Sequence, residues 1–185
     1  MTPPLAPTAP PVTPEALRAL LDPDLHEETV GAALAADPDP EPSRAVAERR
    51  VLEALRYLWL VSAHPDRLAG LFLPVEQAVD EVWHHLILQT REYRDLCEQR
   101  LPGGFFVHHR GIAYTAYTDT AVRGGGPDRR RGAEEALRWI PPYVAAFGPF
   151  DEGALPHWTM VRFLHEELGL SLAEISALEP PPPTP

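Results

Sequence analysis

The fold class is decided by one segment, residues 75–101, which reads VEQAVDEVWHHLILQTREYRDLCEQRL. Its apolar residues recur at intervals of three and four, which is the spacing of one face of a helix. Pro74 precedes the segment and Pro102-Gly103-Gly104 follows it, so both ends carry helix-boundary signals. We therefore predict one continuous helix from about Val75 to Leu101.

The rest of the sequence predicts further helices and no sheet. Thr13-Pro14-Glu15 and Asp22-Pro23-Asp24 each combine a capping residue, a proline and an acid, which is typical of a helix start. Ser43 can cap a third helix that ends at His64-Pro65. Later candidates are residues 129–140, with a break at Pro141-Pro142, residues 156–168, and residues 172–178 after Ser171. The predicted fold class is all-α, a small irregular helical domain of about six helices.

Proline is concentrated at the edges of the chain. Of its 23 prolines, six lie in residues 1–14, three in residues 38–42 and five in residues 180–185. Proline-rich segments of this kind are extended or disordered, because proline does not fit inside helices. We therefore predict a disordered tail at residues 1–13, a single helical domain at 14–179 and a second proline-rich tail at 180–185.

The charge is also distributed unevenly. The chain has a formal net charge of −11, of which −7 falls in residues 1–42. An acidic chain has no basic excess for the phosphates of nucleic acid, so general nucleic-acid binding is not expected. The best apolar stretch, Tyr57 to Ala63, is too short to span a bilayer, and no signal peptide is visible. We expect a soluble cytoplasmic protein, and its one cysteine, Cys97, excludes an intramolecular disulfide framework.

Candidate chemistry is concentrated in residues 79–85, VDEVWHH. Asp80 and His84 are four residues apart, so their side chains share one face of a helix. This spacing suits two ligands of one metal ion, and it also suits a carboxylate that orients a histidine. His85 is rotated by about 100° from His84, so we predict it to be partly exposed to solvent, not a second ligand of the same ion. Without an identified third ligand, both interpretations of the Asp80–His84 pair stay open.

A second group of candidate ligands lies downstream, where Cys97 is followed by the pair His108-His109. On an unbroken helix, the distance from His84 to Cys97 corresponds to about 20 Å of rise and about 220° of rotation. One ion could bind both side chains only if the helix breaks. Two smaller sites, Asp80 with His84 and Cys97 with His108 or His109, are as consistent with the sequence as one. Cys97 also fits a buried, small apolar residue.

Three motifs in order resemble the glycine-rich domain-containing protein-like family. They are YLWLV with His64-Pro65, VDEVWHHLILQTREYRDLC at 79–97 and FFVHH at 105–109. The resemblance covers residues 57–109 and implies a small helical domain with its signature core at 43–148. The signature positions that it implies are Asp80, Trp83, His84, Tyr93, Cys97, His108 and His109. Leu86 stands where many members carry a second histidine, and the resemblance implies no settled activity.

The first function hypothesis is a non-catalytic or regulatory domain that works by contact with a protein partner. In this interpretation Trp83 and Tyr93 belong to the core, and Asp80 orients His84. The motif residues are then structural.

The second hypothesis is a transition-metal-binding protein or a metal-dependent enzyme. Its ligands would be Asp80, His84, His108 and His109, with Cys97 as a further ligand or a reactive thiol. A mixture of carboxylate, imidazole and thiol donors favours zinc, iron or copper over magnesium. Nothing in the sequence identifies a substrate.

Overall fold

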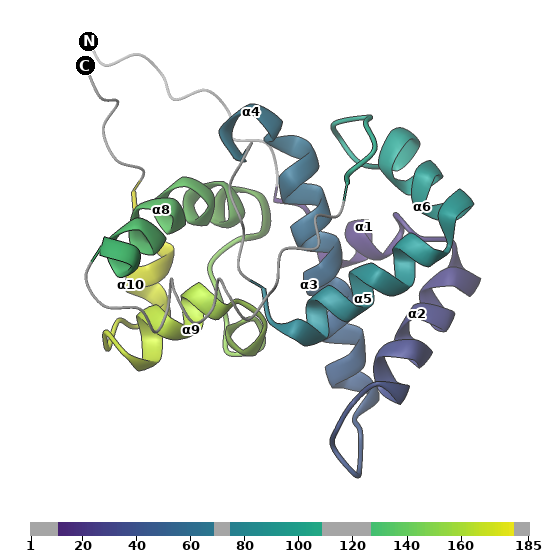
Figure 1. Cartoon of the computed structure of the whole chain (residues 1–185), viewed down its shortest axis with the longest axis horizontal. Helices are drawn as coiled ribbons and strands as arrows, with labels where there is room; N and C mark the ends of the chain where they lie inside the picture. The colour runs from purple at the N-terminus through teal and green to yellow at the C-terminus, as the bar shows by residue number, and fades with distance from the viewer. Residues whose placement is uncertain (1–10, 69–74, 109–126, 180–185) are drawn as a thin grey trace.

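Every regular element is helical in the part of the chain that this computed structural model describes, residues 11–68, 75–108 and 127–179. The all-α class is therefore confirmed for these residues (Figure 1). In chain order the elements are α1 (Pro14–Arg18), α2 (Pro23–Ala35), α3 (Arg44–Ala63), α4 (Pro65–Leu68), α5 (Gln77–Leu88), α6 (Thr90–Asp95), the π-helical turn η1 (Leu96–Arg100), α8 (Pro127–Phe147), the 3₁₀ turn η3 (Leu155–His157), α9 (Thr159–Glu166) and α10 (Leu172–Ser176). The described ranges hold more and shorter helices than predicted, because interruptions divide the longer segments. The predicted tails fall mainly outside these ranges, at residues 1–10 and 180–185.

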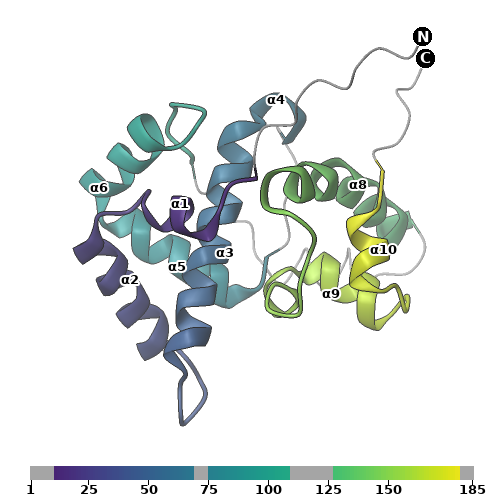
Figure 2. The same ribbon diagram turned by 180° about the vertical axis from the view of Figure 1, so that it is seen from behind.

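Helix α3 lies at the centre of the molecule. Helices α1, α2, α5 and α6 lie on one side of it, and α8, α9 and α10 lie on the other (Figures 1 and 2). Residues Val51, Leu55 and Leu58 recur along α3 at helical spacing, and all three are completely buried. Because α3 is covered from both sides, it holds the two groups of helices together.

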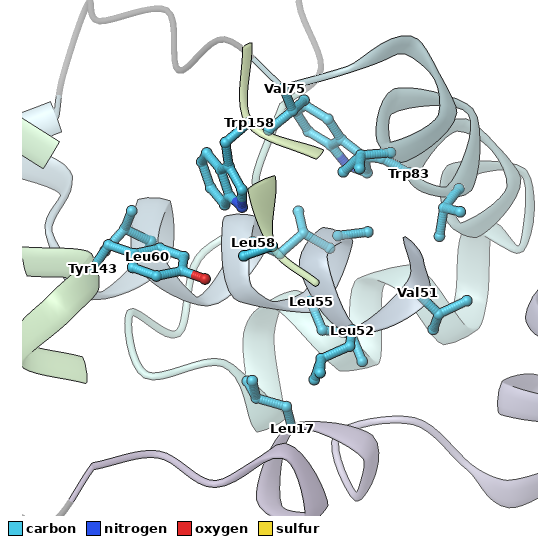
Figure 3. Close-up of a cluster of buried hydrophobic side chains, with 14 of the residues drawn as sticks. Leu17, Val51, Leu52, Leu55, Leu58, Leu60, Val75, Trp83, Tyr143 and Trp158 are labelled. Carbon is cyan, nitrogen blue, oxygen red and sulfur yellow. The ribbon is translucent and has the colours of Figure 1, made fainter. Parts of the chain in front are cut away.

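The hydrophobic core surrounds α3 and draws side chains from both groups of helices. Figure 3 shows Leu17 of α1 and Trp83 of α5 around α3, together with Tyr143 of α8 and Trp158, which lies between η3 and α9. These side chains belong to one cluster of buried residues. Burial of each large apolar side chain contributes about 1.5–3 kcal/mol, so residues far apart in sequence stabilise the same core.

The predicted continuous helix over residues 75–101 is wrong, because the chain breaks at Gln89. Gln89 has φ −83° and ψ 64°, which is outside the helical region, and α6 begins at the next residue. On an unbroken helix Trp83 and Tyr93 would be separated by about 15 Å of rise. The break turns α6 back toward α5, so the Trp83 indole donates a hydrogen bond to the Tyr93 hydroxyl at 2.8 Å. Burial of both side chains outweighs the preference of the sequence for one long helix.

The predicted break at Pro141-Pro142 is also wrong, because α8 continues through both prolines to Phe147. A proline inside a helix removes a backbone donor and crowds the preceding turn. Trp139 and Ile140 before the prolines and Tyr143 after them are all buried. Their packing on one face of α8 compensates for the strain of the two prolines.

No helix in the described ranges combines the length and the apolar character that a membrane crossing requires. The two longest, α3 with 20 residues and α8 with 21, both carry charged side chains along their length.

Replacing Gly103 with alanine is expected to lower the free energy of unfolding by about 1–3 kcal/mol. The Gly103 backbone N–H donates to the Ser62 hydroxyl at 2.9 Å. A Cβ atom at this glycine would overlap the Ser62 carbonyl oxygen and the Phe105 ring. The backbone of the turn after η1 would have to move away from the end of α3. Urea denaturation of the two proteins measures the difference.

Gly31→Ala is the matched control. This glycine lies inside α2, and an added Cβ would meet no atom within 4 Å. Alanine is favoured over glycine inside a helix by about 1 kcal/mol, so we expect Gly31→Ala to raise stability. Equal effects of the two substitutions would contradict the close approach at Gly103.

Candidate functional site

The Asp80–His84 pair lies on α5 and makes the contact that its spacing predicts. His84 Nδ1 lies 3.1 Å from Asp80 Oδ2 and 2.9 Å from the Asp80 carbonyl oxygen. The Asp80 side chain is 22% exposed and that of His84 is 53% exposed. This geometry matches a carboxylate that holds the ring orientation of a histidine.

Trp83 and Tyr93 are buried and form a chain of hydrogen bonds. The Tyr93 hydroxyl accepts from the Trp83 indole and donates to the Val107 carbonyl oxygen at 2.7 Å. Burial raises the pKa of Tyr93, so its phenol stays protonated and remains a donor. The Trp83 ring also packs on Tyr57, with 5.0 Å between centroids. These hydrogen bonds hold the segment around Val107 against α5 and α6.

Cys97 is completely buried in η1. Burial raises the pKa of its thiol, although contacts with the Val107 backbone and the Tyr93 side chain act in the opposite direction. A thiol with a raised pKa is protonated at neutral pH and is a poor nucleophile. Cys97 therefore has the surroundings of a small apolar core residue.

His108 is exposed and lies beside Phe106, with 4.9 Å between the ring centroids. His109 lies outside the described residues. Among residues 11–68, 75–108 and 127–179, no three histidine, cysteine, aspartate or glutamate side chains form a group that could hold a metal ion. Within these ranges the structure brings Asp80 to His84 and Trp83 to Tyr93, and it does not join the two candidate ligand groups into one centre.

A groove of about 280 Å³ lies between α2 and α5. Its apolar lining consists of Ala32, Ala33, Ala36, Ala78, Val82 and Leu88. Leu88, at the end of α5, is 76% exposed. His84 also lines the groove, so the groove adjoins the predicted motif.

Two of the residues that line the groove also carry a buried nitrogen atom without a hydrogen-bond partner among the described residues, namely His85 (Nε2) and Arg50 (Nε). Arg50 is otherwise fixed, because its Nη1 lies 2.9 Å from Asp37 Oδ2 and 3.4 Å from the Ala33 carbonyl oxygen. A buried donor without a partner costs about 1–3 kcal/mol. The sequence predicts His85 only as a partly exposed residue, and the closely spaced alanines of α2 are the signal for a groove at this position.

A second polar cluster lies on the opposite side of α3 and was not predicted. Arg49, Glu53 and Arg56 follow one another at helical spacing, so they share a face of α3. The Glu53 carboxylate is completely buried. Its Oε1 accepts from Arg49 Nε at 2.7 Å and from Arg56 Nη1 at 2.9 Å.

The other oxygen of Glu53 connects α3 to the C-terminal helices. Its Oε2 accepts from the Trp158 indole at 2.9 Å and from the Tyr143 hydroxyl at 3.3 Å. Arg49 extends the cluster outward by pairing with Asp151 at 2.6 Å. We call Arg49, Glu53, Arg56, Tyr143, Trp158 and Asp151 the Glu53 cluster. It is a polar joint between α3 and the C-terminal helices.

A family model described as UCP032817-like matches residues 36–121, slightly less than half of the chain. No curated protein and no solved structure matched the chain. The matched residues include helices α3 to α6 and the whole segment 57–109. The resemblance to the glycine-rich domain-containing protein-like family is therefore wrong, because the family model that matches these residues is a different one. Over residues 36–121 the chain is similar to the UCP032817-like family, whose description names no activity.

Proposed function

We propose that this protein is a non-catalytic helical domain that binds an apolar segment of a partner protein in the groove between α2 and α5. The observation that carries the proposal is the groove itself, with its alanine floor and the exposed Leu88 on its rim. Small side chains let a partner approach the helix backbones closely. An exposed leucine beside them adds apolar area that a partner would remove from water.

The buried residues of α5, α6 and η1 support this proposal by their internal roles. Trp83, Tyr93 and Cys97 are buried, and the Tyr93 hydroxyl is engaged by Trp83 and Val107. Asp80 holds the ring of His84. These contacts fix the position of α5, which provides one wall of the groove. The motif thus acts as a scaffold for the binding surface.

The proposal predicts that the full chain selects peptides from a random linear display library through this groove. The test variant is the double substitution Ala36→Gln and Leu88→Gln, which changes one exposed residue on each wall without adding charge. Peptides selected on the natural protein should bind the variant about 30-fold more weakly, since loss of a central apolar contact at such a site costs about 2 kcal/mol. Fluorescence anisotropy of labelled peptides measures the affinities.

Leu168→Gln is the matched control, because Leu168 is a second exposed leucine, 54% accessible, between α9 and α10. We expect it to leave peptide affinity unchanged. Failure to select any peptide, or peptides that bind both variants equally well, would refute the proposal. Thermal melting of each variant verifies that the fold is retained.

A second candidate function is transition-metal binding, with Asp80, His84, His108 and His109 as ligands and zinc, iron or copper as the ion. It is favoured by one observation, the Asp80 carboxylate that orients His84, since metal-ligating histidines are held in this way. The candidate predicts stoichiometric metal in tag-free protein by elemental analysis, lost in His84→Ala and in His108→Ala. His26→Ala, on α2, is the control that should retain it. Substoichiometric metal that none of these substitutions changes would exclude this function.

A further inference from the structure

We infer that the proline-rich segment 4–10 of this chain binds back on the chain's own helices, as a polyproline II helix laid over the side chains of Phe147, Trp59 and His64. We call these three side chains the aromatic row. They come from the end of α8, from α3 and from the residue that follows α3. This surface is different from the groove between α2 and α5, so the inference does not rest on the function proposed for that groove.

The aromatic row is contiguous and partly open to solvent. The Trp59 ring lies 5.3 Å from the Phe147 ring and 6.3 Å from the His64 ring, both measured between centroids. All three side chains are half-buried. The other three tryptophans of the chain lie in the described ranges and are buried, namely Trp83, Trp139 and Trp158. Trp59 therefore differs from them in offering part of its ring to a further contact.

The N-terminal segment is fixed beside this row. The Val12 backbone N–H donates to the Ala146 carbonyl oxygen at 2.6 Å, and Ala146 directly precedes Phe147. Val12 also packs against the hydrophobic core. Figure 2 shows the residues before α1, in purple, entering beside α8. The chain that precedes Val12 is therefore tethered next to the aromatic row.

The sequence of this preceding chain suits an aromatic surface. Residues 1–10 lie outside the described ranges, read MTPPLAPTAP and contain no charged side chain. Pro4, Pro7 and Pro10 are spaced three apart, which is one turn of a polyproline II helix, so they lie along one edge at intervals of about 9 Å. Segments of this kind bind surfaces lined by aromatic rings. Residues 4–10 in this conformation extend over about 22 Å, which is enough to cover the row.

The tether favours the chain's own tail over a proline-rich segment of another protein. A short covalent connection gives the tail an effective concentration on the order of millimolar at the row. A polyproline II segment is also already extended before it binds, so it loses little conformational entropy. A separate protein has no such tether, and it would have to displace the tail from the row.

The experiment uses the full chain labelled with 5-fluorotryptophan, in which Trp59→Phe identifies the Trp59 fluorine resonance. The test variant replaces three prolines of the tail together, Pro4→Ser, Pro7→Ser and Pro10→Ser. The matched control replaces three prolines after α10, Pro181→Ser, Pro182→Ser and Pro183→Ser. In the test variant we expect the Trp59 resonance to shift and to be broadened more by a dissolved gadolinium chelate. The control should leave this resonance unchanged, and the three buried tryptophans should not respond in either variant.

Two outcomes would overturn the inference. One is a Trp59 resonance that is the same in the natural protein and the test variant, or that shifts equally in the test variant and the control. The other is a Trp59 contact that disappears on dilution, because it would come from the tail of a second copy. Nuclear Overhauser contacts between the Hδ protons of Pro7 or Pro10 and the Trp59 indole are the expected direct evidence. Circular dichroism verifies that the helices are retained, and Pro7→Ser alone replaces a test variant that loses them.

Discussion

Replacing Glu53 with alanine is expected to lower the free energy of unfolding by about 3–5 kcal/mol. The carboxylate is completely buried and accepts four hydrogen bonds, from Arg49, Arg56, Tyr143 and Trp158. Its removal leaves the buried Arg56 guanidinium without its counter-ion and leaves the Trp158 indole without an acceptor. An uncompensated buried charge is among the most damaging consequences of a single substitution.

Urea denaturation followed by circular dichroism measures this loss, with Glu48→Ala as the matched control. Glu48 lies on the same helix and pairs with Arg44 at 2.8 Å, but both side chains are exposed. Exposed ion pairs of this kind contribute about 0–1 kcal/mol. Glu53→Gln should fall between the two, because the amide keeps an acceptor and loses the charge. Similar losses for Glu48→Ala and Glu53→Ala would show that the Glu53 cluster is not a stabilising joint.

Acidification from pH 7.5 to pH 4 is expected to remove about 3 kcal/mol of stability through His157 alone. Burial, together with the nearby Arg49 and Arg50 guanidinium groups, lowers the pKa of His157 to about 4. An unfolded histidine has a pKa of about 6.5. Between these two values the unfolded chain binds a proton that the folded chain does not, so stability falls as the pH falls. Above about pH 6.5 the contribution of His157 is complete.

The measurement compares the free energy of unfolding at several pH values for the natural protein and for His157→Gln. Carboxylates titrate in both proteins, so the difference in slope between pH 6.5 and pH 4 isolates the histidine. His157→Gln should lose less stability on acidification, by about 3 kcal/mol. Parallel pH profiles would show that His157 titrates with the same pKa in the folded and unfolded states, and would contradict its lowered pKa.

The starts of the helices were predictable because local signals set them. The Thr13 and Asp22 side chains accept hydrogen bonds from the first turns of α1 and α2, and Ser171 forms a capping box with Glu174. The start of each of these helices depends on residues that are close to one another in the sequence. Ser43 stands at the predicted start of α3 but makes no side-chain capping bond, so its helix is held by packing.

The interruptions and continuations inside helices were not predictable, because they depend on residues distant in sequence. Gln89 carries no strong helix-breaking signal, yet the chain turns there so that Tyr93 reaches Trp83. Pro141 and Pro142 carry such a signal, yet α8 continues through them because Trp139 and Tyr143 share the core. In both cases tertiary packing, not local helix propensity, determines the backbone conformation.

The candidate site was predictable where it depends on one helix. The spacing of Asp80 and His84 predicts their contact, and it is present at 3.1 Å. The groove was not predictable, because its walls belong to α2 and α5, and the lining residues that carry unpaired nitrogen atoms come from α3 and α5. Bringing Arg50 and His85 to one surface requires the packing of three helices, which periodicity alone does not specify.

The long-range hydrogen bonds of the Glu53 cluster also bear on the order of folding. They join residues 90, 102 and 105 positions apart, so α3 pairs with side chains made much later in synthesis. Contacts of such separation form slowly, because a long loop must close before they stabilise anything. Before Trp158 is synthesised, the face of α3 that carries Glu53 is exposed to solvent. The C-terminal side of α3 therefore reaches its final packing only when α8 and the residues after it dock on it, and an uncovered helix face in this interval favours aggregation of the growing chain.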